Sequence, residues 1–294
     1  TSEYPPIVGG ISTHVDQLSK CMKKKGYDVK ILSTGKNGFG LKALGNVLEI
    51  DRMLRVELFI FRKLPIFRIK PSYTIILKSI LKKLVKAFNP DYVHVHGMRP
   101  LEATKKISCP VFFTNHTSGF LKRVEKIGTN IDKEKLLHRL SHLKGILAPS
   151  SERELAVLDL GYKGPTKFIP NGVDDSFFIK DGNCLRKKLG ITDNQKVILL
   201  AGRLSEVKGV IDFANAMVKL SSISEVNKEF VVLIAGDGKL KREMEKILAR
   251  SFFKTNAIFL GYVPNHKMPL VYRSSDLIVL PSHYEATSIT GLEA

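Results

Sequence analysis

Residues 196–210 read Lys-Val-Ile-Leu-Leu-Ala-Gly-Arg-Leu-Ser-Glu-Val-Lys-Gly-Val. The apolar run predicts a buried strand, the segment bounded by two glycines predicts a loop, and the apolar spacing from Val210 onward predicts a helix. Strand, loop and helix in this order form the unit of a parallel α/β sheet. Ligands of such sheets bind beyond the carboxyl ends of the strands, where Arg203 and Lys208 could neutralise a diphosphate. Two solvated surface cations are the alternative interpretation.

The same alternation of short apolar runs and helical segments continues along the chain. With 294 residues, the chain has the length of two domains, and the turn-rich residues 170–183 predict a boundary that gives domains 1–178 and 179–294. We expect strands at 29–32, 92–96, 111–115, 145–149, 166–169, 196–201, 230–235, 257–260 and 277–280. We expect helices at 11–25, 73–88, 151–160, 210–220, 240–249 and 269–274.

Composition narrows the function classes. The chain is 44% hydrophobic and 26% charged, which is typical of a globular protein and excludes a disordered or collagen-like chain. Of the net charge of +19, +15 lies in residues 1–180. No helix-turn-helix, zinc-finger or aromatic RNA-binding signature accompanies this charge, so we expect no nucleic-acid partner.

The sequence also bears on the compartment. Three widely spaced cysteines predict no disulfide framework, and neither a spanning segment nor a secretion signal is recognisable. We therefore expect a cytoplasmic protein. The chain starts at Thr1 and stops at Ala294 within what reads as a helix, so we expect a fragment of a longer protein.

Two further segments combine small residues with the start of a helix. Gly9 and Gly10 precede the first helix, where backbone N–H groups could face an anion, although a tight turn explains them equally well. Glu285 and Glu293 stand eight positions apart around a loop of small residues that follows a strand. Carboxylates at such a loop could accept hydrogen bonds from sugar hydroxyls. A helix start capped by Thr287 or Ser288 is the alternative.

Together these segments resemble the retaining glycosyltransferases of the GT-B fold, specifically family 4. The resemblance covers nearly the whole chain and implies two Rossmann-like, doubly wound α/β domains that face a cleft, the second of them truncated. It rests on the order and spacing of Gly9-Gly10, residues 90–96, the strand before His116, residues 170–174, Gly202-Arg203 with Lys208-Gly209, residues 235–238, and Glu285 with Glu293.

The resemblance implies residue roles. His116 and Glu285 would be catalytic, with His116 near the reacting centre and Glu285 facing the donor sugar. Many relatives have Pro-Phe-Gly where this chain has Ala286-Thr287-Ser288. Because of this difference, the resemblance does not determine which nucleotide sugar is the donor. The donor-binding residues would be Gly9, Gly10, Arg203, Lys208, Thr287, Ser288, Ile289, Thr290 and Glu293, of which Glu293 would bind the ribose.

The implied function is transfer of a sugar from a nucleoside-diphosphate sugar to a hydroxyl of a glycan or a lipid-linked glycan. The resemblance implies a front-face displacement with retention of anomeric configuration, without a metal or another cofactor. A nucleotide-sugar epimerase of the same architecture and a non-catalytic nucleotide-sugar-binding relative are the alternatives.

Other candidate sites are weaker. The chain contains no Asp-x-Asp pair and no phosphate-binding Gly-x-x-x-x-Gly-Lys-Ser/Thr loop. The pairs His94/His96 and His138/His142 could each hold a metal. Isolated pairs of histidines at these spacings are common, and we interpret both pairs as structural.

A basic amphipathic segment raises the question of a membrane partner. Residues 73–88 carry apolar side chains on one side and lysines on the other, and Arg52, Arg55, Arg62, Lys63, Arg68 and Lys70 precede them. Such a helix could lie on an anionic membrane, which would place the protein peripherally at its inner face. A helix packed on the sheet with a solvated lysine face is the alternative.

Overall fold

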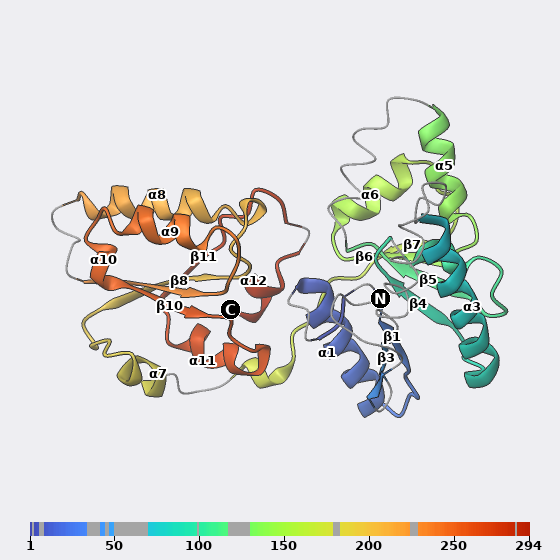
Figure 1. Ribbon diagram of the computed structural model, residues 1–294, viewed down its shortest axis with the longest axis horizontal. Helices are drawn as coiled ribbons and strands as arrows, with labels where there is room; N and C mark the ends of the chain where they lie inside the picture. Colours follow the sequence, from blue (N-terminus) through green and yellow to red (C-terminus); the bar gives the residue numbers. More distant parts are fainter. Residues whose placement is uncertain are drawn as a thin grey trace, which may run out of the picture. The chain divides into compact units, whose positions relative to one another are not determined.

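The structure is a computed structural model that describes residues 1, 3–5, 9–33, 42–44, 47–49, 70–98, 100–116, 130–178, 183–223, 229–285 and 287–294. The chain forms two compact units, Thr1–Asn171 and Gly172–Ala294 (Figure 1). The expected strands and helices are all present, with ends shifted by at most three residues. Among the described helices, none has the length and apolarity that a membrane crossing requires.

The first unit contains two sheets. Strands β4 to β7 form a parallel sheet in chain order, whereas β1 pairs in parallel with β3, and β3 pairs antiparallel with β2. The strands are β1 (Ile31–Ser33), β2 (Lys42–Leu44), β3 (Val47–Glu49), β4 (Val93–His96), β5 (Val111–Thr114), β6 (Gly145–Ala148) and β7 (Thr166–Phe168). The helices are α1 (Gly10–Lys24), α3 (Lys70–Phe88), η1 (Leu101–Thr104), α5 (Asn130–Leu140) and α6 (Ser151–Asp159).

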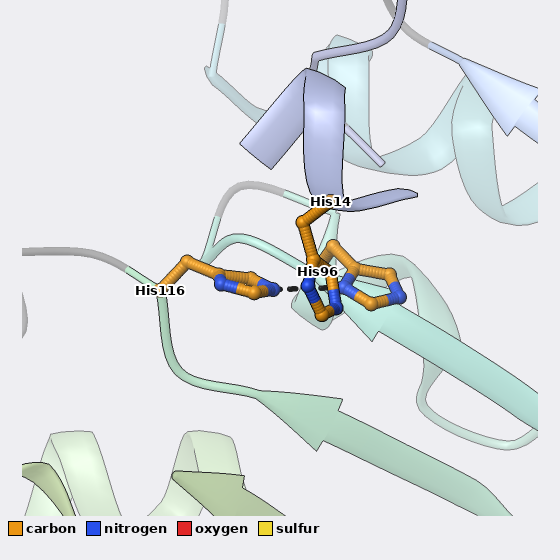
Figure 2. Close-up of side chains that lie close together, drawn as sticks. All are labelled: His14, His96 and His116. Carbon is orange, nitrogen blue, oxygen red and sulfur yellow. Dashed lines mark hydrogen bonds between the residues drawn. The ribbon is translucent and has the colours of Figure 1, made fainter. Parts of the chain in front are cut away.

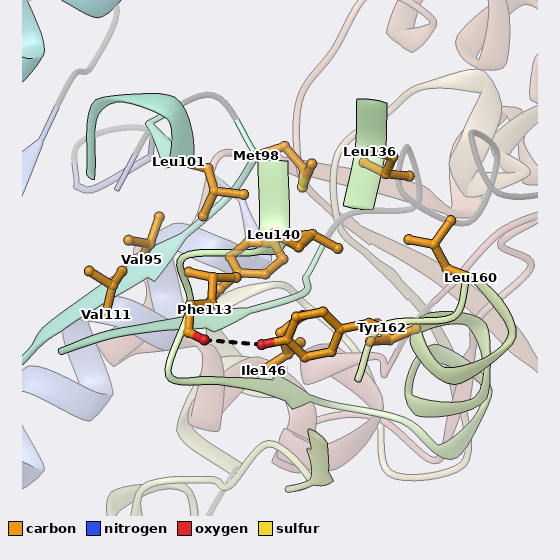
Figure 3. Packing of buried hydrophobic residues seen from close by; sticks show 12 residues of the cluster. Val95, Met98, Leu101, Val111, Phe113, Leu136, Leu140, Ile146, Leu160 and Tyr162 are labelled. Atoms are coloured by element: carbon orange, nitrogen blue, oxygen red, sulfur yellow. Dashed lines mark hydrogen bonds between the residues drawn. The ribbon is translucent and has the colours of Figure 1, made fainter. Parts of the chain in front are cut away.

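The core of this unit lies between the parallel sheet and α5 and α6. Phe113 of β5 and Leu140 of α5 are fully buried there, and Figure 3 shows them among aliphatic side chains. The Tyr162 hydroxyl donates a 3.2 Å hydrogen bond to the carbonyl oxygen of Leu143, so the polar end of this buried ring is satisfied. This packing fixes β4 and β5, whose carboxyl ends carry histidines.

Helix α3 packs its apolar side against the first unit. Leu77 is buried together with Ala103 of η1, and Val85 is buried further along the helix. Leu77 and Val85 therefore pack within the protein rather than facing a bilayer. Lys82, Lys83 and Lys86 remain exposed. Of the basic residues before the helix, Arg52, Arg55, Arg62, Lys63 and Arg68 lie outside the described residues.

The second unit is a doubly wound parallel sheet with the strand order β10-β9-β8-β11. The chain runs outward from β8 through β9 to β10 and then returns to place β11 on the other side of β8, so the switch point lies between β8 and β11. The strands are β8 (Lys196–Ala201), β9 (Phe230–Ala235), β10 (Ala257–Gly261) and β11 (Leu277–Val279). The helices are η2 (Asp175–Phe177), α7 (Asn183–Lys188), η3 (Glu206–Lys208), α8 (Val210–Ser221), α9 (Lys241–Leu248), α10 (Phe253–Asn256), η4 (Asn265–Lys267), α11 (Met268–Arg273) and α12 (Ile289–Glu293).

Helices cover both faces of this sheet. In Figure 1, α8 and α9 lie over one face, and α7 and α11 lie over the other. Side chains alternate accordingly along β8, where Ile198 packs in the cluster of Phe213 on α8, and Val197 packs in the cluster of Tyr272 on α11. A strand buried on both faces must be apolar throughout, which explains the continuous apolar run of β8.

Candidate functional site

The loop after β8 holds two cations at the switch point of the second unit. Gly202 leaves the strand with φ +139°, and Gly209 caps α8 with φ +59°, a left-handed conformation that favours glycine. Between them, η3 places Lys208 one residue before the helix cap. Arg203 is exposed, and Lys208 is one-third exposed (33%). The helix start and both side chains thus lie at the carboxyl end of β8.

The loop after β11 lies directly against this first loop. The backbone N–H of His283 donates to the carbonyl oxygen of Val207 over 3.0 Å. Gly209 approaches Pro281 so closely that a Cβ at position 209 would stand 2.8 Å from the carbonyl carbon of Pro281 and nearer still to its oxygen. Ser288 caps α12 by accepting a 3.1 Å hydrogen bond from the backbone N–H of Gly291, which confirms the capping interpretation for Ser288.

A pocket opens between these two loops and contains several of the expected donor-binding residues. Arg203, Lys208, Ser288 and Thr290 line it, whereas Thr287 and Ile289 do not. Because the first residue of α8 also lines it, the pocket lies at a helix N-terminus, which favours an anion. The complete lining is Leu200, Ala201, Gly202, Arg203, Lys208, Val210, Leu280, Pro281, Ser282, Ser288 and Thr290.

Glu285 is paired with Lys208. The ammonium group of Lys208 contacts Oε2 of Glu285, and the Ser282 hydroxyl donates to the same oxygen over 3.2 Å. Both charged side chains are 33% exposed, so the pair is partly solvated. The two residues therefore meet although 77 positions separate them. An anion entering the pocket would compete with Glu285 for the Lys208 ammonium.

Glu293 is buried and bonded within the second unit. Its residue is 8% exposed, and its two carboxylate oxygens accept hydrogen bonds from the Asn265 amide at 3.0 Å and from the Tyr272 hydroxyl at 2.9 Å. Burial and the adjacent carboxylate raise the pKa of Tyr272 well above its usual value, so the phenol keeps the proton that it donates. Glu293 is not among the residues that line the pocket.

The other expected residues lie in the first unit. Helix α1 begins at Gly10, with Gly9 as its cap, and the N–H of Thr13 donates to the carbonyl oxygen of Gly9 over 3.1 Å. Residues 6–8 of the preceding segment lie outside the described residues. His116 follows β5, at the carboxyl edge of the parallel sheet.

His116 belongs to a cluster of histidines (Figure 2). Its Nε2 lies 3.0 Å from Nδ1 of His96, the last residue of β4, and the ring of His14 from α1 meets the His116 ring edge to face at 4.5 Å. His94 also belongs to the cluster, because its ring centroid lies 4.1 Å from that of His96, and its Nε2 lies 2.6 Å from the Thr114 hydroxyl.

Burial favours the neutral form of each histidine in the cluster. Burial lowers the pKa of His94 to about 4 and holds the pKa of His96 and His116 well below the usual value, with smaller contributions from the neighbouring histidines. Burial also lowers the pKa of His14. Neutral imidazoles can bind metals, and the ligand nitrogens of His14, His96 and His116 all lie within 4.8 Å of one another. Among the described residues, these three could hold a metal ion.

Comparison with known proteins identifies the family. Residues 8–177 match Glycosyltransferase Family 4, and residues 183–294 match Glycosyl transferases group 1. The chain belongs to glycosyltransferase family 4. The expected GT-B class, with two Rossmann-like α/β units built on parallel sheets, is thereby confirmed.

Named relatives of this family 4 glycosyltransferase span most of the chain. It is 24% identical to an uncharacterized glycosyltransferase of Methanocaldococcus jannaschii, over 100% of this chain and 76% of the relative. It is 22% identical to the alpha-monoglucosyldiacylglycerol synthase of Streptococcus pneumoniae, over 100% and 67%. Sucrose-phosphate synthase from Thermosynechococcus elongatus has the same fold, with a TM-score of 0.75 at 16% identity, over 100% of this chain and 74% of that one.

The sequence of this family 4 glycosyltransferase did not indicate that two further histidines lie beside His116. From the sequence, His96 is interpreted as structural and His14 is not singled out, whereas the structure joins both to His116. Their positions carried a signal, because His96 ends a strand and His14 lies one turn into the helix that follows Gly9 and Gly10. His142 instead contacts the Thr104 hydroxyl through Nε2 at 2.8 Å, in keeping with the structural interpretation.

The histidine cluster predicts that the first unit loses stability in mild acid. The folded pKa values are lowered, so the unfolded chain binds more protons below about pH 6.5, and the free energy of unfolding falls as pH drops from 6.5 toward 4. Melting temperatures at pH 7.5, 6.5, 5.5 and 5.0 should decline before most carboxylates protonate. A His94→Gln/His96→Asn variant should decline less over this range. A wild-type melting temperature that stays constant from pH 7.5 to 5.0 would contradict the prediction.

Proposed function

We propose that this glycosyltransferase moves a sugar from a nucleoside-diphosphate sugar to an acceptor hydroxyl, with retention of anomeric configuration and without a bound metal. The observation that carries the proposal is the pocket at the β8/β11 switch point. Arg203, Lys208 and the first turn of α8 lie there together, and all three favour a diphosphate.

The cations would act on the leaving group. As the bond between the sugar C1 and the phosphate oxygen breaks, negative charge develops on the diphosphate, and preorganised positive groups lower the barrier most where charge develops. Arg203 and Lys208 would supply this stabilisation. The acceptor oxygen would form its bond to C1 on the face that the diphosphate leaves, and the acceptor's proton would pass to the departing phosphate oxygen.

Glu285 would face the donor sugar once the diphosphate has taken over the Lys208 ammonium. Its carboxylate contacts Lys208 and Ser282. Release from Lys208 would leave carboxylate oxygens that can accept hydrogen bonds from sugar hydroxyls. Thr287, Ser288, Ile289 and Thr290 would present backbone groups to the sugar and phosphate. Gly9 and Gly10 would bind the donor, and His116 would act at the sugar.

Calorimetry with the full-length protein tests the proposal. We expect saturable binding of one among UDP, GDP and ADP, unchanged by EDTA. The corresponding nucleotide sugar should be consumed only when an acceptor is present, with the anomeric configuration of the product read by NMR. Conversion of the sugar without an acceptor would establish the epimerase alternative, and binding without any turnover would favour a non-catalytic relative. Loss of binding in EDTA would refute metal independence.

Glu293 would bind the nucleotide ribose through its carboxylate, which Tyr272 and Asn265 hold in place. We expect the wild-type protein to bind a nucleotide roughly tenfold more tightly than its 2′-deoxy form, which corresponds to one hydrogen bond. Glu293→Gln should reduce this ratio, whereas Asn265→Ala keeps the carboxylate and controls for disturbed packing. An unchanged ratio in Glu293→Gln would show that Glu293 serves only the core.

A glycan or lipid-linked acceptor fits both the relatives and the surface. The Streptococcus pneumoniae relative is named for a glucosyldiacylglycerol product. We propose that this protein acts in the cytoplasm at the inner face of a membrane, held by charge rather than by insertion. The exposed lysines of α3 would supply that attraction.

Liposome binding tests the role of the α3 lysines. Each lysine near an anionic surface contributes about 1 kcal/mol, so Lys82→Gln/Lys83→Gln should weaken binding to anionic vesicles roughly 30-fold at low salt. Lys23→Gln/Lys24→Gln removes two exposed lysines at the end of α1 and serves as the control. Equal weakening by both variants would show that net charge alone, rather than α3, governs the attraction.

A further inference from the structure

A single hydrogen bond couples the expected catalytic histidine to a buried neighbour. Nδ1 of His96 and Nε2 of His116 lie 3.0 Å apart, and the two rings are inclined by 23° with centroids 5.3 Å apart (Figure 2). His96 ends β4 and is 5% exposed, whereas His116 follows the neighbouring strand β5. The parallel pairing of β4 and β5 sets His96 opposite Thr114, two residues before His116, so the sheet brings the two histidines to the same edge.

This bond links the tautomers of the two rings. A neutral imidazole has one N–H and one lone pair, so a bond between two neutral rings requires one nitrogen to donate and the other to accept. The Nε2–H form is the more stable tautomer of a neutral histidine. Both rings can adopt it only if Nε2–H of His116 donates to Nδ1 of His96. In that arrangement the remaining nitrogen of His116, Nδ1, carries a lone pair.

We propose that His96 is a positioning residue. Its Nδ1 accepts a hydrogen bond from Nε2–H of His116, which leaves Nδ1 of His116 as a hydrogen-bond acceptor for a ligand hydroxyl. The inference rests on the proposed function for the identity of that ligand, the sugar acceptor. The hydrogen bond to the neighbouring ring decides which nitrogen of a histidine carries the proton, and thus whether the ring offers a donor or an acceptor.

The surroundings of the pair restrain both rings. His94 lies against His96, and its own Nε2 is engaged with the Thr114 hydroxyl, while the His14 ring meets His116 edge to face. The buried guanidinium of Arg153 is close enough to act electrostatically on His116 and disfavours a second proton there. These contacts hold the ring of His116 in a defined orientation.

NMR on the unliganded protein tests the tautomer directly. With histidine labelled with ¹⁵N and EDTA present to remove adventitious metal, we expect Nε2 of His116 to be protonated and Nδ1 to show the shift of a nitrogen without a proton. His96→Leu removes the acceptor and should leave His116 as a mixture of tautomers. His96→Asn should preserve the wild-type tautomer, because its side-chain oxygen can take the place of Nδ1. His94→Leu, the same change two residues earlier on β4, is the control.

Kinetics supply the second readout. We expect His96→Leu to lower kcat/KM for the acceptor about tenfold, the value of one hydrogen bond, while nucleotide affinity stays unchanged. His96→Asn should recover most of this loss. If His96 had only a structural role, both variants would have a lower melting temperature. The kcat/KM for the acceptor and the affinity for the nucleotide would then fall together.

The outcomes separate this inference from the proposed function. A protonated Nδ1 on wild-type His116, or an unchanged tautomer in His96→Leu, would overturn the inference whether or not the protein transfers sugar. The expected tautomers together with an absence of sugar transfer would overturn the proposed function and leave the coupling of His96 to His116 in place. If His96→Leu fails to fold, the wild-type and His96→Asn spectra still decide the tautomer.

Discussion

Lys208→Ala is expected to weaken nucleoside-diphosphate binding about ten- to a hundredfold, because a hydrogen bond to a charged group contributes about 1.5–3 kcal/mol. Turnover should fall by a further factor of roughly 100, since charge on the leaving group grows toward the transition state. Lys208 lines the pocket at the switch point and is the partner of Glu285. Calorimetry with the nucleotide and single-turnover kinetics with the nucleotide sugar would measure the two effects separately.

Three further variants make the Lys208 prediction specific. Lys239→Ala breaks the exposed 3.1 Å ion pair with Glu206, outside the pocket, and should leave nucleotide binding unchanged. Lys208→Arg keeps the charge and should retain much of the affinity. Glu285→Gln releases Lys208 and should bind the nucleotide at least as tightly as wild type while losing turnover. Wild-type affinity in Lys208→Ala would remove Lys208 from the site.

Gly209→Ala is expected to destabilise the second unit strongly and to abolish nucleotide binding. At φ +59° an alanine is strained by about 1–2 kcal/mol, and its Cβ would also collide with the backbone of Pro281, which cannot rotate away as a side chain could. The collision would push the loop after β11 off the loop after β8. Because those two loops form the pocket, stability and binding should fail together.

Gly190→Ala is the matched control for Gly209→Ala. Gly190 has a similar φ of +69°, but a Cβ there would meet nothing within 4 Å, so only the backbone strain remains. We expect Gly190→Ala to lower the melting temperature by a few degrees and to bind the nucleotide normally. Equal melting temperatures for the two variants would mean that the Gly209–Pro281 approach does not hold the loops together.

Local sequence patterns predicted the long, strongly periodic elements but missed short or polar ones. Strand β8 was recognisable because burial on both faces requires an unbroken apolar run. Helix α5 is not among the helices that periodicity indicated, because only a thin apolar stripe, including Leu136 and Leu140, is buried among charged residues. Strands β2 and β3, with three residues each, and the four-residue α10 were also missed, although the equally short β1, β7 and β11 were predicted within slightly longer ranges.

Motif order located most of the candidate site, since Gly202–Gly209 and residues 281–294 each read as loops beside helix starts. What motif order could not supply is the partner of each side chain. Glu285 was expected to face a sugar and is held by Lys208, and Glu293 was expected at the ribose and is bonded to Tyr272 and Asn265. His96 was set aside as structural and contacts His116.

The sequence by itself determined the alternation of strands and helices, the α/β class, the family and the loops that carry the candidate residues. The alternation and the class depend on the periodicity of neighbouring residues and on the short-range chemistry of turns, whereas the family follows from the resemblance in motif order along the chain. Only the tertiary structure decided that β11 pairs with β8 and that β4 pairs with β5. Those pairings bring together Lys208 with Glu285 and His96 with His116. A local sequence pattern does not record them, because strand order arises from packing between distant segments.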